Sequence, residues 1–304
     1  MTSRRRILVT GATGKQGGAL IKALLSKPTN DFEIYALTRD IHSNSAKQLS
    51  KQDVHLIEGN LDNVEAIFGQ VTKPVWGVFS VPILDRGTKK EELQSKSLTK
   101  AAVASGVSHI VFTATDRGGQ EESENNPTSV PHFASKFRIE EDIKSTVSAS
   151  GGALTYTFLR PVAFYENISN NFLGRAFVSM WRLNGDTRKL QMISTSDIGE
   201  IAAEAFLHAK EEEFCNKAIS LAGDELSPAD AARIFQEETG RALPQTYQWL
   251  GWALRYMIPD LRHMFAWFRS TGFGADLQVI KNNYPFVADF RTWLRDNSDW
   301  ARKS

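Results

Sequence analysis

The stretch RRILVTGATGKQGG, residues 5–18, decides how this chain folds. Its apolar run, residues 7–9, has the length and composition of a buried parallel strand, and an amphipathic helix begins at Gly18. Three glycines lie in the turn between them at the spacing G-x-x-G-x-x-G, namely Gly11, Gly14 and Gly17. Glycine permits a positive φ and a close approach of ligand to backbone, while N–H groups at a helix start attract a phosphate. The stretch therefore predicts a turn that binds a pyrophosphate.

The residues that follow favour a dinucleotide over a nucleoside triphosphate. A second strand, expected at residues 33–39, completes a βαβ unit of the size that dinucleotide-binding folds use. A triphosphate-binding loop requires the pattern G-x-x-x-x-G-K-[ST], whereas here Lys15 directly follows Gly14 and is itself followed by Gln16. The alternative to a ligand site is a glycine turn with a purely structural role.

The end of the second strand indicates which dinucleotide to expect. Binders of NAD carry an acidic residue here that accepts hydrogen bonds from the ribose 2′-hydroxyl, whereas an arginine accommodates the 2′-phosphate of NADP. Thr38 stands where such an acid is expected, and Arg39 follows it. A guanidinium binds phosphate through charge-assisted hydrogen bonds, so the sequence predicts NADP(H). Asp40 argues against this unless its side chain points away, and a surface arginine is the alternative reading of Arg39.

Further apolar runs extend this unit into a larger sheet. The expected strands are residues 54–58, 75–80, 109–115 and 154–159. A long helix is expected at 88–105, and the alternation of strands with helices predicts an α/β fold with a doubly wound, mostly parallel Rossmann sheet. We expect an NADP-binding domain at residues 1–160, to which parts of 190–222 return. A smaller, mainly helical C-terminal lobe, 161–304, would serve a substrate or partner.

Three residues near the expected strand ends are candidates for cofactor contact, because ligands of open α/β sheets lie beyond the carboxyl ends of the strands. They are Asp62, Phe79 and Thr113. Asp62 is equally suited to cap a helix at residues 63–70, and Phe79 is equally suited to the core. Thr113 would present its hydroxyl from the fifth strand.

Residues 132–136, HFASK, carry the candidates for proton handling. The preceding polar segment, 116–131, has the composition of a mobile loop beside the cleft. His132 and Lys136 are four residues apart on an expected helix and so share one face. An ammonium beside the nicotinamide ribose can hydrogen-bond its hydroxyls, and a group one turn earlier can meet the substrate. A surface lysine and a packed histidine are the alternatives.

Composition excludes several classes of function. The net charge of +1 over 304 residues gives no support for direct nucleic-acid binding, and no apolar run reaches the length of a membrane span. Cys215 is the single cysteine, which excludes an intrachain disulfide and a cysteine metal cluster, and no metal site is expected. We expect a cytoplasmic protein, with the nucleus left open as a second location. The sequence also leaves open whether the chain forms a homodimer.

Together these motifs resemble the NmrA-like branch of the atypical short-chain dehydrogenase/reductases. The shared stretches are GATGKQGG at 11–18, Thr38-Arg39, HFASK at 132–136, PVAFYEN at 161–167 and Asp197-Ile-Gly199. The resemblance implies an NADP(H)-binding Rossmann domain with a smaller lobe, and it makes Lys136 a cofactor-contacting lysine. For the pyrophosphate it implies Gly11, Thr13, Gly14, Gln16 and Gly17. Near the nicotinamide it implies Pro161, Phe164 and Asn167.

His132 stands where typical members of the wider superfamily carry the tyrosine of Y-x-x-x-K. That tyrosine exchanges a proton with a carbonyl because the nearby lysine ammonium stabilises its phenolate. The same ammonium keeps an imidazole neutral and a poorer donor, which disfavours carbonyl reduction by the standard route. Hydride transfer to a quinone or an activated double bond needs less acid help, and Lys136 can itself supply the proton.

Two functions follow from the resemblance. One is an NADPH-dependent oxidoreductase that acts on a quinone, an enone or a carbonyl compound. The other is a non-enzymatic NADP(H) redox sensor and transcriptional co-regulator that acts through a protein partner. The partner is accordingly either a small-molecule substrate or a regulatory protein.

Overall fold

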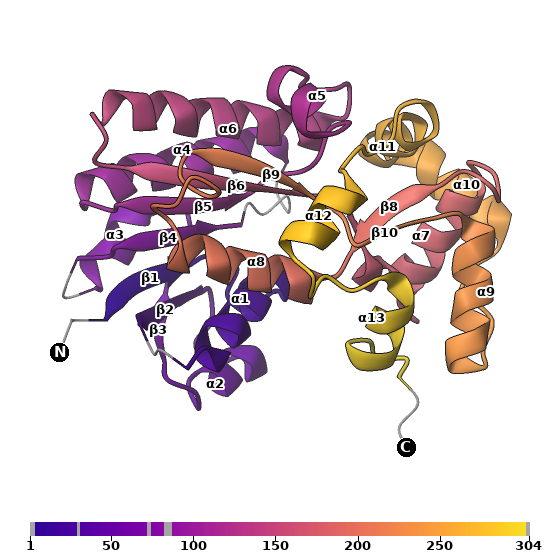
Figure 1. The fold of residues 1–304 in the computed structure, drawn as a ribbon, viewed down its shortest axis with the longest axis horizontal. Coiled ribbons are helices and arrows are strands. Elements are labelled where there is room, and N and C mark those ends of the chain that lie inside the picture. The colour runs from indigo at the N-terminus through magenta and orange to yellow at the C-terminus, as the bar shows by residue number, and fades with distance from the viewer. Residues whose placement is uncertain (1–3, 29–30, 72–73, 82–86, 302–304) are drawn as a thin grey trace. The chain divides into compact units, whose positions relative to one another are not determined.

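The computed structural model describes residues 4–28, 31–71, 74–81 and 87–301. Its main sheet has seven strands in the order β3-β2-β1-β4-β5-β6-β9 (Figure 1). They are β1 (Arg5–Val9), β2 (Phe32–Thr38), β3 (Val54–Glu58), β4 (Gly77–Ser80), β5 (His109–Thr113), β6 (Thr155–Pro161) and β9 (Lys217–Leu221). The pairs that join β3 through β6 are parallel. The order reverses between β1 and β4, which confirms the doubly wound Rossmann sheet and puts the glycine turn at the switch point.

The chain divides into two compact units. Unit 1 comprises Met1–Ala114, Ser135–Leu159 and Ile198–Ile219. Unit 2 comprises Thr115–Ala134, Arg160–Asp197 and Ser220–Ser304. The expected NADP-binding domain at 1–160 and C-terminal lobe at 161–304 stay a prediction.

Helices cover both faces of the sheet in unit 1. They are α1 (Lys15–Ser26), α2 (Asn44–Leu49), α3 (Val64–Gly69), α4 (Thr88–Ala104) and most of α6 (Pro131–Ala149) and α8 (Thr195–Leu207). Leu8 and Ile110 pack with residues of α3, α4 and α6 in one hydrophobic cluster. Because side chains alternate along a strand, Phe79 is buried on the opposite face, the side that α1 and α8 cover (Figure 1). A Cβ on Gly199 of α8 would lie 2.5 Å from the carbonyl carbon of Ala19, so these two helices meet backbone to backbone.

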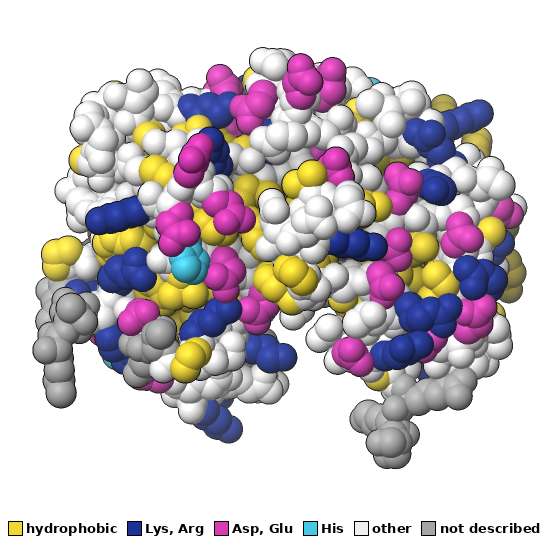
Figure 2. Space-filling view, in the orientation of Figure 1, with side chains coloured by type: hydrophobic (Ala, Val, Ile, Leu, Met, Phe, Trp, Pro, Cys, Tyr) yellow, Lys and Arg dark blue, Asp and Glu magenta, His cyan; other side chains and the backbone are white. Residues whose placement is uncertain are grey.

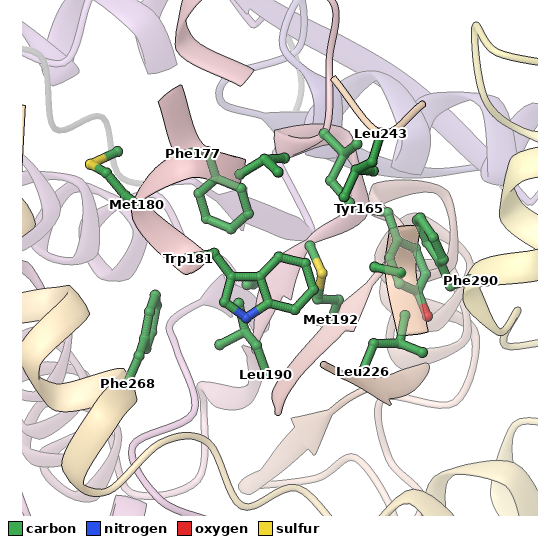
Figure 3. Packing of buried hydrophobic residues seen from close by; sticks show 14 of the residues in the cluster. Tyr165, Phe177, Met180, Trp181, Leu190, Met192, Leu226, Leu243, Phe268 and Phe290 are labelled. Carbon is green, nitrogen blue, oxygen red and sulfur yellow. The ribbon is translucent and has the colours of Figure 1, made fainter. Parts of the chain in front are cut away.

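Unit 2 has its own core around a three-stranded sheet, β10-β8-β7. These strands are β7 (Ala163–Phe164), β8 (Leu190–Ile193) and β10 (Asp224–Leu226). The helices are α5 (Gln120–Asn125), α7 (Phe172–Arg182), α9 (Pro228–Thr239), α10 (Gln248–Met257), α11 (Pro259–Ser270), α12 (Leu277–Asn283) and α13 (Phe290–Asp296). Figure 3 shows the indole of Trp181 in the middle of the hydrophobic cluster, with Phe177, Leu190 and Met192 around it.

The aromatic residues near the C-terminus divide into two groups. Phe265 and Phe268 of α11 are buried in the cluster of unit 2 itself. Trp249, Trp252 and Tyr256 of α10 are between 61% and 67% exposed. The buried rings of α11 are therefore part of the core of unit 2.

The polar segment 116–131 was expected to be a mobile loop, and the structure corrects this. The segment contains α5, and the side chains of Asp116 and Arg117 are fully buried. The Asp116 carboxylate accepts hydrogen bonds from the backbone N–H groups of Gly118, Gly119 and Gly274. The Arg117 guanidinium donates to the backbone carbonyls of Ser123 and Asn126 within the segment and of Thr115 just before it. The polar side chains here satisfy the hydrogen bonds of buried backbone N–H and C=O groups, which the composition of the segment does not reveal.

Charged side chains of both signs alternate over the face that Figure 2 displays, as the near-zero net charge leads one to expect. On α9 and α13, for example, Arg291 and Arg295 pair with Glu238. Within the described ranges, no helix combines the length and the hydropathy that crossing a bilayer requires.

Candidate functional site

The glycine turn is built from close backbone contacts. Gly11 has a φ of +60°, which favours glycine. Gly14 donates a hydrogen bond of 2.9 Å from its backbone N–H to the carbonyl oxygen of Gly11. A Cβ on Gly17 would lie 2.3 Å from that same oxygen, so the first turn of α1 sits directly against residue 11. A Cβ on Gly14 would lie 3.2 Å from that oxygen, a tight contact, so all three glycines favour this close approach of the helix start to the strand end.

The start of α1 fits an anionic group. Gly14 is the N-cap residue, and no side chain of the described residues caps the helix. Thr13 and Gly14 are exposed, while the Oε1 atom of Gln16 is buried without a hydrogen-bond partner in the described part of the chain. Rotation of the Gln16 amide by a half-turn presents its NH₂ group instead. The uncapped N–H groups and this side chain match what a phosphate requires.

Thr10 is a residue of the site that the sequence reading missed. Its side chain is fully buried, and its hydroxyl donates to the carbonyl oxygen of Phe79 at 3.1 Å. The same hydroxyl oxygen accepts a hydrogen bond of 2.9 Å from the backbone N–H of Val81. Thr10 therefore ties the end of β4 to the end of β1, directly before the glycine turn. No sequence motif predicts this role, because threonine is found after strands in many other structural contexts.

Arg39 is exposed where β2 ends beside the glycine turn. The register places Val9 of β1 next to Ala36 of β2, so the chain enters the turn next to Thr38. The carboxylate of Asp40 accepts a hydrogen bond of 2.7 Å from the backbone N–H of His42. Asp40 thus serves the turn that follows it, which removes the main argument against Arg39 as a phosphate ligand.

The three candidates near strand ends differ in their surroundings. The ring of Phe79 is fully buried, so it belongs to the core, the alternative weighed above. Asp62 is bound by Lys90 and Gln94, each at 2.8 Å, and the cap of α3 is the side chain of Asn63 instead. Capping by Asp62 is therefore wrong, and its contact with adenine stays a prediction. Thr113 ends β5 and is 2% exposed, and its contact with the cofactor stays a prediction.

Lys136 is held by an acidic residue that the sequence did not single out. Its ammonium pairs with the carboxylate of Glu91 on α4, and the hydroxyl of Ser135 donates to the other carboxylate oxygen at 2.8 Å. The Glu91 side chain is fully buried and that of Lys136 is 13% exposed. Burial lowers the pKa of the Lys136 ammonium, while the charge and hydrogen bond of Glu91 oppose this. In a parallel sheet the helices after β4 and β5 begin at the same edge as the glycine turn.

His132 belongs to unit 2 and pairs with Asp260 of α11. Its Nδ1 lies 2.7 Å from a carboxylate oxygen of Asp260. Burial acts to raise the pKa of the Asp260 carboxyl, but the hydrogen bond and charge of His132 outweigh it and lower the pKa. Lys136 and His132 thus each lie against a carboxylate of their own, Glu91 and Asp260. A carboxylate on Nδ1 orients the ring and leaves Nε2 to handle a proton.

The three residues that the resemblance placed near the nicotinamide lie in unit 2. Pro161 is the buried last residue of β6, and its carbonyl accepts a hydrogen bond of 3.1 Å from the backbone N–H of Asp116. Phe164 in β7 and Asn167 in the 3₁₀ turn Tyr165–Asn167 are both half-buried. Their contact with a nicotinamide stays a prediction.

Curated proteins similar to this chain are named for an NmrA-like family domain. A protein of Dictyostelium discoideum, named as containing an NmrA-like family domain, is 21% identical over 96% of this chain and 97% of its own length. An NmrA-like family domain-containing oxidoreductase of Penicillium ochrochloron is 30% identical, although the match covers 47% of this chain and 44% of that protein.

Solved structures share the fold along almost the whole chain. The triphenylmethane reductase of Citrobacter, in complex with NADP(H), has a TM-score of 0.69 at 19% identity, covering 94% of this chain and 97% of that one. NmrA, a negative transcriptional regulator in complex with NADP, has a TM-score of 0.71 at 16% identity, with 98% and 99% covered. The NADPH-dependent quinone oxidoreductase QOR2 of Escherichia coli gives 0.68 at 20%, with 94% and 97% covered. The model of the NmrA-like family matches residues 3–282, and the chain therefore belongs to that family.

Proposed function

We propose that this chain binds NADP(H) at the glycine turn and transfers a hydride from NADPH to a small organic acceptor, a quinone, an enone or a carbonyl compound. The observation that carries the proposal is the glycine turn at the switch point of the sheet: α1 starts so close to Gly11 that position 17 has no room for a Cβ, and its N-cap, Gly14, has no side chain to cap the helix. Ligands of such sheets bind beyond the strand ends at this point, and a helix start there favours a pyrophosphate.

The binding residues divide by the part of the dinucleotide that they meet. Those that hold the pyrophosphate are Gly11, Thr13, Gly14, Gln16 and Gly17. Arg39 holds the 2′-phosphate, since its guanidinium suits a phosphate and Asp40 is engaged elsewhere. Selectivity for NADP(H) over NAD(H) then comes from one charge-assisted contact at the end of β2.

Lys136 and His132 handle the proton. Bound NADPH supplies a hydride, and the acceptor also needs a proton on oxygen or carbon. The Lys136 ammonium donates to the ribose hydroxyls and is the first candidate for the proton donor, since the Glu91 carboxylate holds it in place. His132, oriented by Asp260, is the second. Either group regains its proton from water.

Curated relatives favour the enzyme over the regulator. Several of them are named NmrA-like oxidoreductases, and two of the solved relatives are a triphenylmethane reductase and a quinone oxidoreductase. These names belong to those proteins, and we extend only the reaction class, NADPH-dependent reduction, to this chain.

A substrate panel tests the reaction. The absorbance of NADPH is followed with quinones, enones and aldehydes, in the wild type, in Lys136→Met and in the control Lys144→Met. Lys144 is on the same helix and pairs with Glu141 at the surface. We expect turnover of at least one class, lost in Lys136→Met and kept in Lys144→Met. If Lys136→Met reduces an acceptor at the wild-type rate, the role of Lys136 is refuted. If the wild type reduces none of the acceptors, the proposed enzymatic activity is refuted.

A further inference from the structure

Glu91 is an acidic residue in a place where acids are rarely found. Its side chain is fully buried in the first turn of α4. A buried carboxylate is retained only with a counter-charge or hydrogen bonds, because it loses its hydration. Glu91 has both, the ammonium of Lys136 and the hydroxyl of Ser135. Both partners are neighbours in the HFASK stretch of α6, so one carboxylate organises that turn.

Ion pairs engage other charged groups on the helices that bear Glu91 and Lys136. On α4 and α6, Glu92 pairs with Arg138 at 2.6 Å and Lys96 pairs with Asp142 at 3.2 Å. One turn before Lys136, His132 pairs with Asp260, and one turn after it Glu140 is buried on α6. Glu91 is the charged group whose carboxylate raises the pKa of the Lys136 ammonium, against the burial that lowers it.

We propose that Glu91 is the positioning residue of Lys136: its carboxylate takes one N–H of the ammonium, keeps the lysine charged, and leaves the remaining N–H donors for the bound dinucleotide. An ammonium has three donors in tetrahedral directions, so fixing one restricts where the other two point. This inference rests on the proposed function, because it needs NADP(H) beside Lys136. It adds a residue on another helix that sets both the direction and the charge of the lysine.

The chain offers a matched control for this role. Glu91 and its neighbour Glu92 both bridge α4 to α6 by an ion pair, but the Glu92–Arg138 pair lies nearer solvent. A merely structural bridge predicts that Glu91→Gln loses more stability than Glu92→Gln, because its pair is buried, while the pH dependence of NADPH binding stays that of wild type in both. A positioning role predicts an effect on the ligand for Glu91→Gln alone. Glu91→Asp keeps the negative charge but shortens the side chain by one methylene. It therefore distinguishes the effect of the charge on Lys136 from the effect of the carboxylate's position.

The experiment measures the dissociation constant of NADPH, from the fluorescence of the bound nucleotide, between about pH 6 and about pH 10. Without the Glu91 charge the Lys136 ammonium loses its proton at lower pH. In Glu91→Gln the pH at which affinity begins to fall should therefore move down by at least about one unit relative to wild type. Glu91→Asp should keep the wild-type pH dependence with affinity weakened at every pH. Glu92→Gln should match wild type.

Each outcome decides the inference. If wild type binds NADPH and Glu91→Gln follows the same pH curve, the positioning role is wrong while the proposed function stands. If wild type binds no NADPH, both fail. If Glu91→Gln does not fold, two other variants provide the test: the single variant Glu91→Asp and the double variant Glu91→Gln/Lys136→Met. The double variant removes the uncompensated lysine and should restore folding, and failure to restore it contradicts a specific pairing.

Discussion

Gly17→Ala tests the glycine turn most sharply. The added methyl carbon would lie 2.3 Å from the carbonyl oxygen of Gly11, 2.7 Å from its carbonyl carbon and 2.9 Å from the Cα of Ala12. All three are backbone atoms, and none can rotate away. To reach an ordinary contact of about 3.5 Å, α1 must move off the turn by about 1 Å.

Two opposing effects set the size of the change. Overpacking of a close contact costs about 1–3 kcal/mol. Gly17 lies inside α1 without a positive φ, so alanine recovers about 0.5–1 kcal/mol of helix preference. We expect a net loss of roughly 1–2 kcal/mol in the free energy of unfolding. The displaced N–H groups should weaken NADPH binding by at least about tenfold, which is about 1.4 kcal/mol.

Gly18→Ala is the control, one residue along the same helix. Its added methyl would meet the carbonyl oxygen of Ala12 at 3.6 Å, an ordinary contact. We expect this variant to gain about 0.5–1 kcal/mol and to bind NADPH like wild type. Urea unfolding followed by circular dichroism gives the stabilities, and NADPH fluorescence gives the affinities. Equal NADPH affinities in the two alanine variants would refute the steric reasoning.

Two further predictions concern buried polar residues of unit 1. Thr10→Val keeps the shape of the side chain but removes the hydroxyl that joins Phe79 to Val81, so urea unfolding should show a loss of about 1–3 kcal/mol, and an unchanged midpoint would contradict this role. Burial, with help from the charge of Arg5, lowers the pKa of His109 to about 3. The unfolded chain binds this proton from about pH 6.5 downward, so stability should fall by up to about 1.4 kcal/mol per pH unit between pH 6.5 and 3. Urea midpoints at about pH 7.5 and about pH 5 should differ less in His109→Gln, and an equal difference would argue against the buried neutral imidazole.

The sheet could be predicted because each strand is a local signal. The run at 54–58 is β3 as expected, and the helix expected at 88–105 is α4, Thr88–Ala104. The strand ends differ from the expected ones, because hydrogen bonding to adjacent strands decides where a strand ends. β5 stops at Thr113, and β6 continues to Pro161. The glycine turn was equally accessible, since its spacing needs a strand before it and a helix after it.

The partners of the candidate residues were not predictable. Glu91 stands in the charged run Lys89-Lys90-Glu91-Glu92, which is typical of a solvated helix start, yet it is buried and its two partners come from α6. Asp260 becomes the partner of His132 through contacts more than a hundred residues apart in the chain. Asp62 and Phe79 were placed by their position after strands, but neighbouring side chains and the alternation of faces decided their surroundings.

The most direct test of the account compares the dissociation constants of NADPH and NADH in the wild type and in Arg39→Ser. A charge-assisted contact with the 2′-phosphate is worth about 1.5–3 kcal/mol, so wild type should bind NADPH roughly ten- to a hundredfold more tightly than NADH. Arg39→Ser should lose most of that preference while its affinity for NADH stays close to wild type. Equal affinities for the two nucleotides in the wild type, or a preference that survives the substitution, would contradict the account.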